Sequence, residues 1–228
     1  MKNFLLILLA LVVWWWIGYI ANQQLTEHNT MDHTNEPTPE LIIEIPTTVT
    51  GATETSPITV NGVAVELEGK RIISGAKLID TELDKKADYF DQVQTDRISN
   101  YSGYKLIEIV PSLDTPVCTR QTKELESAAK LFPTTPILII SNDTPFALQR
   151  FCAANGISNI HVFSDARTRQ FGRSNGLFMP QYGLLARAIM IVDNDMNVVY
   201  IDYAEEVTHE LDLMNALAYL KKLTTTQQ

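Results

Sequence analysis

The chain has 228 residues, of which 45% are hydrophobic and 20% are charged, and its formal net charge is −9. This composition supplies enough apolar side chains for one sizeable folded core. The acidic balance argues against a nucleic-acid partner, because nucleic-acid binding requires a basic surface. The densest basic stretch, RTRQFGR at residues 167–173, is interpreted as a solvated helix face.

The first element in chain order is an apolar segment. Residues 4–21, FLLILLALVVWWWIGYIA, carry no charge and have three consecutive tryptophans near their end. This length fits a short transmembrane helix, and aromatic rings favour the level of the lipid headgroups. We therefore predict that residues 1–21 form a membrane anchor. A cleavable signal peptide is the alternative, although Tyr19 fits poorly at the third position before a cut after Ala21.

The charges around this segment predict its orientation. Lys2 precedes it, no Lys or Arg follows before Lys70, and acidic residues accumulate after it. Positive charge tends to stay on the cytoplasmic side. We therefore expect a single-pass protein of a bacterial inner membrane, with its folded body in the periplasm. If the segment is cleaved, the body is expected to be soluble in the periplasm.

Residues 22–56 are predicted to be an acidic, flexible tether. They are rich in Thr, Pro, Glu and Asn and poor in aromatic residues. Within them, His28, Asp32 and His33 have a spacing that could bind zinc or copper on a helix, but a solvated linker is the favoured interpretation. The folded domain is assigned to residues 57–223, and residues 224–228 are assigned to a disordered tail.

The pattern becomes periodic after residue 57. Residues 58–69 alternate about Asn61–Gly62, which is a strong β-hairpin signal. Further strands are predicted at residues 104–110, 136–141, 160–164, 186–193 and 197–203, and helices at residues 117–132, 144–156, 166–176 and 209–223. Residues 76–100 receive no assignment. Alternating strands and helices predict an α/β fold with a central mixed sheet and helices on both faces.

The segment PSLDTPVC, residues 111–118, contains one of only two cysteines in the chain. Cys118 follows a predicted strand and opens a predicted helix, whose first turn offers free N–H groups and a partial positive charge. Both favour the thiolate, which is the nucleophilic form of cysteine. Pro111 and Pro116 stiffen the loop, and the Thr115 hydroxyl lies within plausible reach of the sulfur. A buried cysteine that acts as a small hydrophobic residue is the alternative.

PSLDTPVC resembles the active-site signature of the peroxiredoxins, and the chain more narrowly resembles their bacterial thiol peroxidase subfamily, the atypical two-cysteine type. SNDTPFALQRFC, residues 141–152, is similar to the segment that holds the family's resolving cysteine. GLLARAIMIVD, residues 183–193, is similar to the strand that carries its active-site arginine. The hairpin VNGVAVELEG, residues 60–69, resembles the subfamily's N-terminal addition. The resemblance runs from about residue 57 to residue 223 and implies a thioredoxin-like fold.

The resemblance implies a role for five residues. Cys118 would be the peroxidatic cysteine, which attacks a hydroperoxide and becomes a sulfenic acid. Thr115 would align the sulfur with the peroxide, and Pro111 would shield it from water. Arg187 would stabilise the thiolate and the leaving oxygen. Cys152 would form an intramolecular disulfide with Cys118, and a thioredoxin-like protein would reduce that disulfide.

The same resemblance implies hydrogen peroxide and alkyl hydroperoxides as substrates, a homodimer, and neither a cofactor nor a resident metal. A disulfide requires Cα atoms within about 7 Å of each other. If the cysteines start further apart, both helices must partly unwind in each cycle. We therefore expect low local stability around residues 143–156.

Two alternatives remain for the folded domain. One is a thioredoxin-like interaction domain held by a static disulfide between Cys118 and Cys152, which an exported location favours. The other is a cysteine hydrolase, which needs a histidine base. Only His161 and His209 lie in the folded domain, and neither belongs to a recognisable partner motif.

Overall fold

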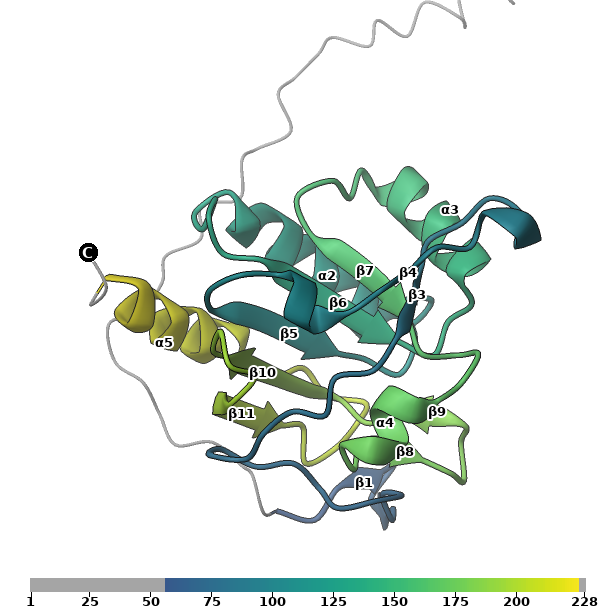
Figure 1. Ribbon diagram of the computed structural model, residues 1–228. Coiled ribbons are helices and arrows are strands. Elements are labelled where there is room, and N and C mark those ends of the chain that lie inside the picture. Colours follow the sequence, from purple (N-terminus) through teal and green to yellow (C-terminus); the bar gives the residue numbers. More distant parts are fainter. Residues whose placement is uncertain (1–55, 226–228) are drawn as a thin grey trace, which may run out of the picture. The chain divides into compact units, whose positions relative to one another are not determined.

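The computed structural model describes residues 56–225, and their centre is a seven-stranded mixed sheet (Figure 1). The strand order is β11-β10-β5-β6-β7-β3-β4. The strands are β3 (Leu83–Lys85), β4 (Thr95–Asp96), β5 (Lys105–Ile109), β6 (Ile137–Ser141), β7 (His161–Ser164), β10 (Ala188–Val192) and β11 (Val198–Tyr203). β5, β6 and β7 are parallel, whereas the pairs outside them are antiparallel. The predicted mixed sheet is confirmed.

Helices cover both faces of this sheet. The helices are α2 (Pro116–Ala129), α3 (Pro145–Asn155), α4 (Gln170–Ser174) and α5 (Leu213–Thr225). One apolar core joins the sheet to α2, α3 and α5, and we call this side the three-helix face. The other core joins the sheet to α4 and to the hairpin of β8 (Phe178–Met179) and β9 (Leu184–Leu185). Side chains of β5 alternate between these cores, as the period of a strand requires.

Local signals set the boundaries of α2 and α3. The side chain of Thr115 caps α2 and that of Thr144 caps α3, with a proline at the first helical position in each case. Gly156 ends α3 with φ +64°, which suits glycine because it has no Cβ. The sequence placed both helix starts within one residue.

The first hairpin and the last helix test two further predictions. Strands β1 (Thr59–Val60) and β2 (Val63–Ala64) pair around Asn61–Gly62, as predicted. The prediction for the last helix is wrong at its start, because α5 begins at Leu213 rather than at residue 209. The Asp212 carboxylate accepts from the Asn215 N–H (3.0 Å) and caps the helix there. The helix continues to Thr225, two residues beyond the predicted domain end.

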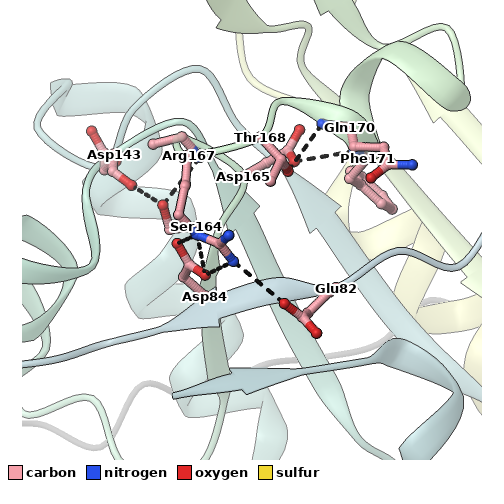
Figure 2. A network of polar contacts seen from close by, with 10 residues as sticks. Glu82, Asp84, Asp143, Ser164, Asp165, Arg167, Thr168, Gln170 and Phe171 are labelled. Atoms are coloured by element: carbon pink, nitrogen blue, oxygen red, sulfur yellow. Dashed lines mark hydrogen bonds and ion pairs between the residues drawn. The ribbon is translucent and has the colours of Figure 1, made fainter. Parts of the chain in front are cut away.

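The unassigned residues 76–100 contribute strands β3 and β4 to the edge of the sheet, with the 3₁₀ helices η1 (Phe90–Gln92) and η2 (Ile98–Asn100). Strands of two or three residues are too short to show a hydrophobic period, so the sequence gives no signal for them. An ion pair holds this edge in place. The Arg167 guanidinium donates to the buried carboxylate of Asp84 and to Glu82, as Figure 2 shows.

Residues 167–170 and Arg173 are exposed, as predicted for a solvated face, but the prediction is wrong for Phe171 and Gly172, which are buried, and only residues 170–174 are helical. Arg167 bridges to β3, and Arg173 pairs with Glu68. Phe171 in the same stretch is fully buried.

The predicted anchor (residues 1–21), residues 22–55 of the tether with the His28, Asp32 and His33 group, and the last residues of the tail lie outside the described residues. Within residues 56–225, no helix is both long enough and apolar enough to cross a membrane.

Candidate active site

Cys118 lies in the first turn of α2, directly after the loop that follows β5. Its side chain is fully buried, and its thiol is free. The Thr115 hydroxyl accepts from the Cys118 backbone N–H (3.4 Å) and donates to the carbonyl oxygen of Ser112 (3.2 Å). Pro111 is buried at the end of the strand. The segment thus places a sulfur at the positive end of a helix and away from bulk water, with a hydroxyl bonded to the backbone of the same residue.

Arg187 brings a positive charge to this sulfur from the start of β10. Its Nη2 donates to Cys118 Sγ at 3.2 Å, and its Nε donates to the Val207 carbonyl oxygen at 2.8 Å. The residue is only 2% exposed. A guanidinium held this firmly stabilises a thiolate and the negative charge that develops on a leaving oxygen.

Gln121 is a site residue that the sequence analysis did not identify. Its Oε1 accepts from Arg187 Nη1 (3.4 Å), and its Nε2 donates to the Leu211 carbonyl oxygen (3.0 Å). It therefore fixes one end of the guanidinium to the loop between β11 and α5. A signal was available, because Gln121 follows Cys118 by three positions and so lies on the same face of the helix.

Asp143 anchors the loop that leads to Cys118. Its carboxylate accepts from the Ser112 hydroxyl (2.7 Å), the Leu113 N–H (2.7 Å) and the Ser141 hydroxyl (2.9 Å). Its carbonyl oxygen accepts from the Ser164 hydroxyl (2.5 Å), as Figure 2 shows. Because Asp143 lies just before α3, one residue joins the Cys118 loop to the start of the helix that carries Cys152.

Glu108 is a buried carboxyl group on the same face of the sheet. It lies in β5 between two residues of the three-helix core, Leu106 and Val110, and it is 1% exposed. Burial raises the pKa of its carboxyl group to about 8, although the charge of Arg187 opposes this shift. Among residues 56–225, its Oε2 finds no hydrogen-bond partner. Glu108 was not among the predicted site residues, although a glutamate within the apolar run KLIEIV was a visible signal.

Cys152 lies in the middle of α3 and is 5% exposed. Burial raises the pKa of its thiol, nearby Lys86 lowers it and Glu126 raises it further. The structure therefore brings Cys118, Thr115, Pro111 and Arg187 into one site, while Cys152 belongs to a separate helix of the same apolar core. Both cysteines are free thiols, so this structure contains no disulfide between them.

Comparisons with known proteins identify the relatives of this chain. The family described as Redoxin matches residues 74–220. A thiol peroxidase of Oceanobacillus iheyensis is 40% identical over 126 residues, which cover 55% of this chain and 77% of that protein. A thiol peroxidase of Staphylococcus aureus is 39% identical over 168 residues, which cover 73% of this chain and 98% of that protein.

Solved structures show the same fold. A peroxiredoxin-like protein from Aquifex aeolicus has a TM-score of 0.65 and 28% identity, covering 74% of this chain and 97% of its own. Thiol peroxidase from Chromobacterium violaceum also has a TM-score of 0.65, with 22% identity, covering 77% of this chain and 100% of its own. At 22% identity, the likeness to the Chromobacterium violaceum protein shows the fold alone.

Proposed function

The chain belongs to the thiol peroxidases of the peroxiredoxin type and reduces peroxides with a thiol, and from this premise we propose that Cys118 is the peroxidatic cysteine of a two-cysteine cycle. One observation carries the proposal. The Cys118 sulfur accepts a hydrogen bond from the Arg187 guanidinium in the first turn of a helix. Helix terminus and guanidinium both favour the thiolate, and a thiolate is the form that attacks peroxide.

The first step of the cycle is an attack on oxygen. The thiolate of Cys118 attacks the terminal oxygen of a hydroperoxide, the O–O bond breaks, and the sulfur becomes a sulfenic acid. The leaving oxygen departs with the electron pair of that bond and takes a proton, so the products are the sulfenic acid and an alcohol or water. Arg187 stabilises the leaving oxygen, Thr115 aligns the peroxide, and Pro111 excludes water.

The second step joins the two cysteines. The Cys152 sulfur attacks the sulfenic acid, water leaves, and an intramolecular disulfide forms. A thioredoxin-like protein then reduces this disulfide by thiol–disulfide exchange. α3 opens during this step, because Cys152 is buried on a helix of its own. Hydrogen peroxide and alkyl hydroperoxides are the proposed substrates, and a homodimer is the proposed assembly.

Mass spectrometry of the reduced full-length chain tests the cycle. One equivalent of hydrogen peroxide is added to the wild type, to Cys118→Ser and to Cys152→Ser, and intact and peptide masses are measured. We expect the wild type to form a Cys118–Cys152 linkage and Cys152→Ser to retain one extra oxygen on Cys118. If reduced Cys118 does not react with peroxide within minutes, the proposal fails and a non-enzymatic thioredoxin-like domain becomes the better account.

For the location, we propose that residues 1–21 anchor the enzyme in a bacterial inner membrane with its domain in the periplasm. The motivation is the charge-free stretch at residues 4–21, with Lys2 before it. Alkaline washing of isolated membranes and sequencing of the mature N-terminus test this proposal. An enzyme that begins after Ala21 and is released with the periplasm would be the soluble alternative.

A further inference from the structure

Glu108 is a buried acidic residue that has no role in the proposed cycle. It is 1% exposed, and its Oε2 has no hydrogen-bond partner within the described part of the chain. A carboxylate in such a place loses its hydration and has no hydrogen bond at Oε2 to offset the loss, whereas a neutral carboxyl group loses much less. The reduced enzyme therefore holds Glu108 in its protonated form at neutral pH.

The register of the sheet places Glu108 next to the active-site arginine. Glu108 pairs with Ile189 of β10 in an antiparallel ladder, so the two side chains share the three-helix face. Arg187 lies two residues before Ile189 and is a diagonal neighbour of Glu108 on that face. The Arg187 charge acts on the Glu108 carboxyl group.

The hydrogen bonds of Arg187 show which group balances its charge. Within residues 56–225 it donates to the Val207 carbonyl oxygen, the Gln121 amide oxygen and the Cys118 sulfur. Only the sulfur of these can carry a full negative charge. Oxidation of the sulfur to a sulfenic acid removes that charge and leaves a buried guanidinium without an anion bonded to it.

We propose that Glu108 takes over the balance of the Arg187 charge when Cys118 is oxidised. This inference rests on the proposed function. In the reduced state the Cys118 thiolate balances Arg187 and Glu108 is neutral. In the sulfenic acid state Cys118 is neutral and Glu108 is ionised. The two groups thus hold one negative charge between them throughout the reaction.

The proton balance of the step follows. The O–O bond of the peroxide breaks, sulfur is oxidised by two electrons, and the leaving oxygen needs one proton. Glu108 releases one proton to the solution in the same step. The enzyme therefore takes no net proton from solution when the sulfenic acid forms. An enzyme that lacks the Glu108 carboxyl group must take one proton from solution.

The other groups around Glu108 do not favour its ionisation, so its protonation depends on whether the Cys118 sulfur balances the Arg187 charge. Glu124 of α2 disfavours an ionised Glu108. Asp202 of β11 pairs with Ile189 and so lies in the same row across the sheet. On the other side, Glu108 pairs with Ile139 of β6, which carries no charge. α5 presents Asn215, whose amide donates to Tyr200. Arg187 is thus the positive charge that favours ionisation.

Proton uptake on oxidation tests the inference. Full-length Cys152→Ser and Cys152→Ser/Glu108→Gln, in weak buffer at pH 7 with an indicator dye, each receive one equivalent of hydrogen peroxide. For each sulfenic acid formed, we expect Cys152→Ser to take up about one proton fewer than Cys152→Ser/Glu108→Gln does. Cys152→Ser/Glu66→Gln is the matched control, because Glu66 is exposed, and it should behave as Cys152→Ser does. Equal uptake in all three variants overturns the inference.

Difference infrared spectroscopy of Cys152→Ser gives a second measurement that needs no change at Glu108. The band of a protonated carboxyl group should disappear on oxidation, and carboxylate bands should replace it. A protonated band that persists overturns the inference. Mass spectrometry of the same samples separates the two proposals. No added oxygen on Cys118 means that the proposed function fails, whereas added oxygen without a proton difference means that only the role of Glu108 fails.

Discussion

Cys118 and Cys152 lie in the same apolar core, but their surroundings differ in polar contacts. Cys118 is more deeply buried, yet a guanidinium donates to its sulfur and a helix terminus points at it. Cys152 lies in the middle of its helix, where burial raises the pKa of the thiol. Burial alone therefore does not distinguish the two cysteines. The partner that stabilises the charged form does.

The two regions also differ in how they are held. The Cys118 loop is fixed by charged hydrogen bonds to Asp143, whereas α3 is held by its Thr144 cap and by contacts with the β3–β4 hairpin. The ring centroid of Phe90 in that hairpin lies 4.7 Å from that of Phe146 in α3. The Ala87 N–H of the hairpin donates to the carbonyl oxygen of Pro145 (3.2 Å). Charged hydrogen bonds thus hold the loop before Cys118, whereas the helix of Cys152 is held by its cap, by that hairpin and by the apolar packing of Leu148 and Phe151.

The largest expected effect comes from removing the feature that distinguishes Cys118. Arg187→Lys loses the planar fork that reaches the sulfur and Gln121 together. We expect the rate constant of Cys118 with hydrogen peroxide to fall by about 10²- to 10³-fold, as for the loss of a preorganised donor. Rapid quenching with an alkylating agent measures this rate.

Arg150→Lys is the matched control, because Arg150 is exposed on α3. It should react as the wild type does. Alkylation of Cys152 should be the same in both variants. A rate for Arg187→Lys within threefold of the wild type would show that the guanidinium does not set the reactivity of Cys118.

The next effect concerns the buried acid beside Arg187. Burial raises the pKa of Glu108 to about 8, above the usual value of 4.5. Between these values the unfolded chain has lost the proton that the folded chain keeps, so stability decreases as pH rises. A difference of one bound proton corresponds to about 1.4 kcal/mol per pH unit. Glu108→Gln should therefore gain about 2 kcal/mol relative to the wild type between pH 5.5 and pH 7.0, measured by urea unfolding.

Glu66→Gln is the control for this measurement, since Glu66 is exposed. Its stability should follow that of the wild type across the same pH range. A constant difference between Glu108→Gln and the wild type would contradict a protonated Glu108 in the folded state.

The sequence predicted those parts of the molecule that local signals determine. A threonine before each helix and a proline at its first position fixed the starts of α2 and α3, and the apolar runs fixed the strands beneath them. It also predicted the set of Cys118, Thr115, Pro111 and Arg187 by resemblance. The structure places these residues together, while their catalytic roles stay predictions.

What the sequence did not predict depends on contacts between distant segments. Asp143 meets the Cys118 loop only because β5 and β6 are adjacent parallel strands. Glu108 meets Arg187 only because β5 and β10 pair in one register. Strand β3 is held by an ion pair with Arg167, far along the chain. No local pattern specifies such pairings, so reasoning from periodicity leaves them unassigned.

A substitution at Asp143 tests both cysteine regions in one variant, because this residue joins the Cys118 loop to the start of α3. Asp143→Asn keeps the shape but weakens the charged hydrogen bonds to Ser112 and Leu113. We expect a loss of about 1–2 kcal/mol in stability, because hydrogen bonds to charged groups are worth about 1.5–3 kcal/mol and Asp143 is half-buried. Amide hydrogen exchange should rise in both residues 111–118 and residues 145–155. Asp114→Asn, at an exposed position of the same loop, should leave both segments unchanged.

The smallest effect separates the opening of α3 from the chemistry at Cys118. Phe90 is 89% exposed, and its ring packs edge-on against Phe146 in the first turn of α3. Such aromatic pairs contribute about 0.5–1.5 kcal/mol, so Phe90→Ala should populate the open helix about fivefold more. If opening precedes the attack of Cys152, disulfide formation becomes faster by a similar factor, while sulfenic acid formation in a Cys152→Ser background keeps its rate.

Tyr89→Ala is the control for this last comparison, because Tyr89 is the exposed neighbour of Phe90. Quenched-flow mass spectrometry of the full-length chain follows the sulfenic acid and the disulfide separately. Equal disulfide rates in Phe90→Ala and Tyr89→Ala would show that the hairpin does not hold α3 closed. A change in the sulfenic acid step would show that the two cysteine regions are coupled, because a contact 28 residues before Cys118 would then reach its chemistry.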